Sequence, residues 1–124
     1  MRYLFLLSVF AITSCSGQTK DCSKFKTGTF KYSSPEFSTH TIVRNDSIQI
    51  ETNSKNNVKI VTSVEWVNEC KYILTYVDVV NYPKKDEVIG KKITIDILSS
   101  DGNTYTCHAI SDAMDSKIEM IKVN

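Results

Sequence analysis

The sequence predicts an all-β domain, an antiparallel up-and-down meander of about eight strands closed into a small barrel or stacked as a sandwich. Apolar and polar residues alternate along most of the chain after residue 22, with the period of two that places one strand face on a core. Short segments rich in Asn and Asp separate these stretches and are typical of hairpin turns. Hydrophobic residues make up 41% of the 124 residues and charged residues 23%, a composition typical of folded chains.

Two segments predict strands most clearly. Ile occupies every second position of residues 93–97, and in residues 48–51 Ile48 and Ile50 alternate with a Gln and a Glu. We expect the Ile side chains to face the core and the polar ones to face water. The remaining strands are predicted at residues 25–32, 39–44, 58–67, 72–76, 104–110 and 117–123.

The connections predict how these strands are arranged. Polar turns are expected at residues 45–46, 53–57, 68–69 and 100–103. Strands joined by short turns form an antiparallel meander, and closure into a barrel removes exposed edges. Residues 78–90 predict a surface loop. Residues 114–123 fit a strand or a helix, and we interpret them as the closing strand.

The N-terminus resembles an export signal. One Arg precedes the apolar run of residues 4–12, which is too short to span a bilayer, and residues 1–14 therefore predict a signal peptide. Residues 12–15 (ITSC) resemble a bacterial lipobox, which implies that Cys15 carries a lipid and that residues 15–21 form a tether to a single domain, 22–124. Ordinary cleavage before Gln18 is the alternative. We expect a lipid anchor in the bacterial cell envelope, at the outer membrane.

Several function classes are disfavoured by the composition. A net charge of +1 provides no basic face for nucleic acid, and four Gly make a phosphate-binding loop hard to build. His40 and His108 belong to no nucleophile motif, and Glu51 is expected on a solvated strand face. No Cys or His pair has the close spacing of common zinc sites. We therefore predict a protein without catalytic residues, metal or cofactor. The one enzymatic alternative, Cys107 beside His108, would place neighbours on opposite strand faces.

The cysteines predict one disulfide. With Cys15 assigned to lipid, three Cys remain in a compartment where disulfides persist. Cys22 lies at the start of the domain and Cys70 in a polar turn, so a bridge between them would fix the N-terminal segment to the sheet. We favour this pairing and expect Cys107 to be a buried thiol. A Cys70–Cys107 bridge stays open.

Three longer segments carry a resemblance to a known family. With the lipobox, residues 21–30 (DCSKFKTGTF), 43–51 (VRNDSIQIE) and 64–72 (VEWVNECKY) resemble a family of small uncharacterised lipoproteins of flavobacteria and their relatives. The resemblance implies that Cys22 and Cys70 pair, and it implies no activity. Relatives sometimes carry the label DNA topoisomerase IV. A neutral exported chain of this length has no room for the ATP-binding and DNA-cleaving domains that the label requires.

Two shorter motifs carry weaker resemblances. Gly28 followed by Phe30 resembles the Gly-x-Trp opening of lipocalins, and a simpler interpretation is a strand in which Phe25 and Phe30 fill one end of the core. Residues 46–48 (DSI) resemble an O-glycosylation motif of exported Bacteroidota proteins, which would place a glycan on Ser47. A plain hairpin turn explains the same residues.

The leading hypothesis is a non-enzymatic envelope lipoprotein whose β domain acts as a protein-interaction module. It would have a filled interior and would present strand edges or the loop at residues 78–90 to another envelope protein. The alternative is a lipocalin-like carrier of a small apolar ligand. The residues expected to line the pocket of such a carrier are Trp66, Tyr72, Tyr76 and Tyr105.

Overall fold

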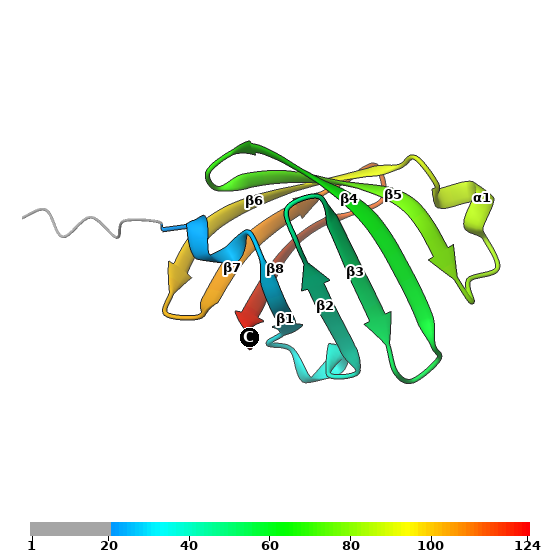
Figure 1. Cartoon of the computed structure of the whole chain (residues 1–124), viewed down its shortest axis with the longest axis horizontal. Helices are drawn as coiled ribbons and strands as arrows, with labels where there is room; N and C mark the ends of the chain where they lie inside the picture. Colours follow the sequence, from blue (N-terminus) through cyan, green and yellow to red (C-terminus); the bar gives the residue numbers. More distant parts are fainter. Residues whose placement is uncertain (1–20) are drawn as a thin grey trace, which may run out of the picture.

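The computed structural model describes residues 21–124, so the predicted signal peptide, Cys15 and all of the tether except Asp21 lie outside the described residues. Eight strands follow one another, with only short helical turns between them (Figure 1). The strands are β1 (Gly28–Tyr32), β2 (His40–Arg44), β3 (Ile48–Asn53), β4 (Val58–Asn68), β5 (Lys71–Val80), β6 (Lys92–Asp101), β7 (Thr104–Ile110) and β8 (Asp115–Lys122). The helical turns are η1 (Ser23–Phe25), η2 (Pro35–Phe37) and α1 (Lys85–Val88). None of these described helices is long and apolar enough to cross a membrane.

The strands form a closed antiparallel barrel in the order β1 to β8. Each strand pairs with the next, and β8 returns to β1 with Phe30 opposite Lys122 and Tyr32 opposite Met120. This confirms the predicted meander and the closing strand, and the barrel is the correct choice over the sandwich. Every strand has a neighbour on both sides, but β5 and β6 pair only over Lys71–Thr75 and Lys92–Asp96, so the last residues of both strands have a partner strand on one side only.

The inward face of β3 differs from the prediction. Gln49 is buried inside the barrel and Glu51 lines its interior, so Ile48 and Ile50, which alternate with them, lie on the outer face and are partly exposed. The register explains the reversal, because Arg44 of β2 lies opposite Gln49 and bonds to it inside the barrel. In β6 the Ile side chains do face inward, and Ile97 is fully buried.

One end of the barrel is closed by η1. The Cys22–Cys70 disulfide joins this segment to the β4–β5 turn, with an S–S length of 2.02 Å and a Cα–Cα distance of 5.3 Å. The ring of Phe25 lies 4.8 Å from that of Tyr105, and both rings are fully buried. The favoured bridge is therefore confirmed. Phe25 and Phe30 fill one end of the core as expected, although Phe25 belongs to η1 and not to the first strand.

Residues 78–90 differ in part from the predicted loop. Strand β5 continues to Val80 and ends where Asn81 takes a positive φ of 60°. The side-chain amide of Asn81 donates a 2.9 Å hydrogen bond to the Asn57 carbonyl, which fixes this turn against the β3–β4 connection. The following residues include the single turn α1, and Lys85 pairs with Asp78 at 2.6 Å. Figure 1 shows α1 and η1 at opposite ends of the barrel.

Candidate ligand-binding cavity

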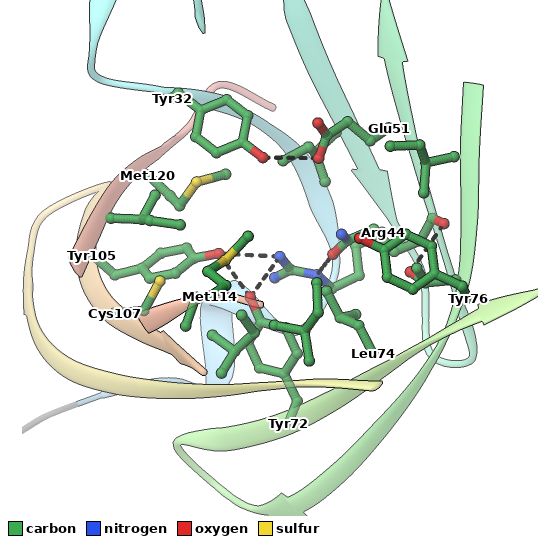
Figure 2. Close-up of a pocket in the computed structure, with 18 residues that line it drawn as sticks. Tyr32, Arg44, Glu51, Tyr72, Leu74, Tyr76, Tyr105, Cys107, Met114 and Met120 are labelled. Atoms are coloured by element: carbon green, nitrogen blue, oxygen red, sulfur yellow. Dashed lines mark hydrogen bonds between the residues drawn. The ribbon is translucent and has the colours of Figure 1, made fainter. Parts of the chain in front are cut away.

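A cavity of about 160 Å³ lies inside the barrel between its closed end and the end near α1. All eight strands contribute side chains to its wall, and Figure 2 shows them pointing toward one another. The volume is close to that of an engineered protein cavity of about 150 Å³ that binds benzene. The lining residues are Tyr32, Ile42, Arg44, Gln49, Glu51, Ile60, Thr62, Tyr72, Leu74, Tyr76, Ile93, Ile95, Tyr105, Cys107, Ala109, Met114, Ile118 and Met120.

Most of this wall is apolar. Leu74, Ile95, Ala109 and Met120 are buried parts of it and come from four consecutive strands, β5 to β8. Small-molecule sites combine such apolar walls with a few placed polar groups that orient the ligand. The cavity therefore has the composition of a binding site for a largely apolar molecule.

We call the end of the cavity next to η1 its floor. The polar groups there are centred on Arg44, a residue that is only 2% exposed. Its Nε donates a 2.8 Å hydrogen bond to Gln49, and its Nη1 donates a 2.7 Å bond to the Phe25 carbonyl. Its Nη2 donates to the hydroxyl groups of Tyr72 and Tyr105, at 2.9 and 3.0 Å. Four neutral oxygens thus hold one buried cation.

Aromatic rings and a low-polarity environment surround this cation. The guanidinium carbon lies 4.4 Å from the centre of the Phe30 ring and 4.6 Å from that of Tyr72, both within the range of cation–π contacts. Burial raises the pKa of Tyr72 well above its usual value, and nearby Tyr105 raises it further, more than the opposing effect of Arg44 lowers it. Because Tyr72 stays neutral at physiological pH, its hydroxyl group does not neutralise Arg44.

A second polar group lies higher on the wall. Tyr32 donates a 2.8 Å hydrogen bond to one carboxylate oxygen of Glu51, and His40 Nδ1 lies 2.9 Å from the other. Burial and the charge of Glu51 both raise the pKa of Tyr32, so the Tyr32 hydroxyl stays protonated and acts as the hydrogen-bond donor. Both oxygens of Glu51 are therefore already engaged by groups of the protein.

The mouth of the cavity lies beside the segment that follows β5. Two further hollows, of about 180 and 120 Å³, share Ile60 with the cavity wall, and Tyr82 lines both of them. Val88 of α1 lines the smaller one. The segment with α1, part of the predicted loop, thus borders the route into the barrel.

The predicted ligand-lining residues fall in two places. Tyr72, Tyr76 and Tyr105 line the cavity, whereas Trp66 is absent from its wall. The ring of Trp66 instead lies 4.6 Å from that of Tyr72, with the Lys26 ammonium group 5.4 Å from its centre, toward the closed end. Trp66 therefore supports the floor from behind and does not face the cavity.

Sequence reasoning missed the polar residues Arg44, Gln49 and Glu51. Arg44 lies two positions after Ile42, a strong core candidate, so the period of two places both on the same strand face. That spacing is the signal that could have identified an inward cation. The candidate glycosylation residue Ser47 lies exposed in the β2–β3 turn, where its backbone N–H bonds to Asn45 at 3.0 Å.

The enzymatic alternative finds no support in the geometry of its two residues. Cys107 lines the cavity, whereas His108 lies on the outer face and pairs with Asp115. Burial raises the pKa of the Cys107 thiol to about 11, so this thiol is a poor nucleophile near neutral pH. Among residues 21–124, no group of three His, Cys, Asp or Glu side chains could hold a metal ion.

Comparison of the chain with models of known protein families, with curated proteins and with solved structures gives no match. The function is therefore inferred from the barrel and its cavity.

Proposed function

We propose that this protein is a membrane-anchored carrier that binds one small, mainly apolar molecule inside its barrel. The cavity of about 160 Å³ is the observation that carries this proposal. The barrel is closed at the η1 end and opens near α1, and the wall between the two is largely apolar. Transfer of an apolar molecule from water into such a space is favourable, at about 25 cal/mol per Å² of apolar surface buried.

Binding, and not chemistry, is the role that we assign to the polar groups. Arg44 is held by Gln49 and two tyrosines, and Glu51 is held by Tyr32 and His40. Fixed polar groups of this kind orient a ligand inside an apolar pocket. We therefore keep the interpretation of a non-enzymatic protein.

The open cavity favours the carrier over the interaction module that the sequence put first. The interaction module assumed a filled interior and presented either strand edges or the loop at residues 78–90. The interior is filled at the η1 end and holds the cavity beyond it, which supports the carrier. The lipobox at Cys15 supplies the anchoring half of the proposal, since a lipidated carrier would lie at a membrane, where apolar molecules accumulate.

A pair of substitutions on one strand tests the proposal. Ala109 is buried in the cavity wall, and the next residue, Ile110, is 44% exposed on the outer face. The test uses residues 16–124, which include all eight strands and the disulfide, exported to a periplasm so that the disulfide forms. Benzene and 1-octanol are titrated while the methyl signals of Ile95 and Met120 are followed by NMR.

The expected result is a saturable shift of these methyl signals in the unsubstituted protein and in Ile110→Phe, and no shift in Ala109→Phe. A phenyl ring at position 109 would occupy the cavity, whereas the same ring at position 110 would point to solvent. The carrier proposal fails if neither compound moves the cavity signals, or if Ala109→Phe binds as well as Ile110→Phe.

A further inference from the structure

We propose that the ligand is an anionic amphiphile, a carboxylate with a short apolar tail whose head group binds Arg44 at the floor of the cavity. This inference rests on the proposed carrier function and specifies the chemical class of its ligand. It follows from the charge of Arg44, from the number of hydrogen-bond donors around it and from the position of Glu51.

The charge of Arg44 has no partner of opposite sign in the part of the chain that the structure describes. No Asp or Glu among residues 21–124 forms an ion pair with it. Its four partners are two phenol oxygens, one amide oxygen and one backbone carbonyl, all neutral. Burial of an unpaired charge is costly, and buried Arg side chains are normally paired with carboxylate or phosphate groups. A ligand anion would supply the missing charge.

The hydrogen-bond donors around Arg44 outnumber the acceptors. The guanidinium carries five N–H donors, and Tyr72 and Tyr105 add one hydroxyl hydrogen each. Arg44 uses four of its donors on the oxygens named above, and the 3.2 Å contact between the two hydroxyl groups uses one more. Within the described residues one N–H on Nη1 and one tyrosine O–H are left without an acceptor. A carboxylate has two oxygens, one for each of these donors.

Glu51, the other charged residue of the wall, does not fill this role. Its two oxygens are engaged by Tyr32 and His40, and Figure 2 shows the Tyr32–Glu51 pair apart from the group around Arg44. The remaining titratable groups that share the floor with Arg44 are Tyr72, Tyr105 and Cys107. Burial raises the pKa of Tyr72 and of Cys107, so neither supplies a negative charge near neutral pH.

The shape of the cavity sets the orientation and size of the tail. Arg44 lies at the closed end of the space, so a bound head group directs the tail past Leu74, Ile95 and Met120 toward the mouth. A volume of about 160 Å³ accepts a short tail, and a longer one would extend beside Tyr76 toward α1. Affinity should rise about fourfold per methylene group until the tail reaches the mouth.

The test compares three ligands that have the same tail and different heads. Residues 16–124 are titrated with octanoate, 1-octanol and octylammonium by calorimetry at pH 7. We expect octanoate to bind at least about tenfold more tightly than 1-octanol, and octylammonium to bind most weakly, because its cation meets Arg44. In a parallel titration followed by NMR, the Arg44 Nε–H signal should move with octanoate only.

Two variants test whether the preference for octanoate over 1-octanol depends on Arg44. Arg44→Met removes the charge and should bring octanoate binding down to the level of 1-octanol. Glu119→Gln removes a carboxylate from an exposed position of β8, outside the cavity wall, and should leave octanoate binding unchanged within threefold. Because Arg44→Met also removes the bond to Phe25 and could prevent folding, the three-ligand comparison on the unsubstituted protein decides by itself.

The outcomes separate the two proposals. If 1-octanol or octylammonium binds as tightly as octanoate, the anionic-ligand inference is wrong and the carrier function stands. If none of the three ligands binds, both are wrong. If octanoate binds at least about tenfold more tightly than 1-octanol and moves the Arg44 signal, both are supported.

Discussion

Arg44 Nη1 lies 2.7 Å from the backbone oxygen of Phe25, so the cation on the cavity floor also holds the short helix η1 that closes the barrel. The disulfide fixes the same segment from its other side, through Cys22. The binding site and the closed end of the barrel therefore share structural supports. Changes at the closed end should alter stability and ligand binding together.

Replacement of Phe25 by Ala should destabilise the protein by about 3–5 kcal/mol, because it leaves a void where a fully buried ring packs on Tyr105. The matched control is Phe37→Ala, since Phe37 is 41% exposed on η2 and its loss should cost less than about 1 kcal/mol. Urea unfolding measures both. Equal losses for the two variants would show that η1 does not form part of the core.

Gly28, the glycine of the lipocalin-like motif, should not tolerate a side chain. It adopts a φ of 135°, and a Cβ there would lie 2.6 Å from the backbone oxygen of Asn124. We expect Gly28→Ala to cost about 2–5 kcal/mol in urea unfolding. Gly90 also has a positive φ, 84°, but open space around it, so Gly90→Ala should cost only about 1 kcal/mol. A Gly28→Ala variant as stable as Gly90→Ala would contradict the close approach of the C-terminus.

Alkylation of Cys107 by iodoacetamide should report both its burial and the occupancy of the cavity. Burial raises the pKa of this thiol to about 11, so the reactive thiolate is lost as the pH falls below that value. The reaction rate of residues 16–124 should therefore rise about tenfold per pH unit between pH 7 and 10. Bound octanoate should slow it. A rate that levels off near pH 9 in the folded protein would contradict this environment.

If the proposed lipid anchor exists, substitution of Cys15 by Ala in the full chain should abolish lipid attachment, because Cys15 is the Cys of the segment that resembles a lipobox. The unsubstituted chain should fractionate with membranes and take up labelled palmitate. The variant should take up none, and a Cys107→Ala chain should behave as the unsubstituted one does. Equal labelling of the Cys15→Ala chain would mean that the N-terminal segment is not a lipobox.

The sequence predicted the course of the chain better than it predicted the site. The meander follows from alternation and short turns, which are local features, and the structure confirms it. The sequence left a barrel and a sandwich open, and it favoured Cys22–Cys70 over Cys70–Cys107 without excluding the second pairing. Of the four aromatic residues predicted to line a pocket in the carrier alternative, Tyr72, Tyr76 and Tyr105 do so and Trp66 does not, because core-lining and pocket-lining residues look alike in a sequence.

The polar part of the site was missed because alternation shows that residues share a face without showing which face is inward. In β3 hydrophobicity favoured Ile48 and Ile50, whereas the cross-strand partner Arg44 places Gln49 inside. Such a choice depends on a neighbouring strand and is not visible in a single segment.

The most direct test of the carrier function is native mass spectrometry of residues 16–124, purified from the periplasm of a bacterial host without added ligand. We expect a reproducible adduct of one small molecule, lost on denaturation, present in Ile110→Phe and absent from Ala109→Phe. Released and identified, that molecule should be a carboxylic acid. A bare protein mass in every sample, together with no uptake of octanoate, would contradict a ligand-binding barrel.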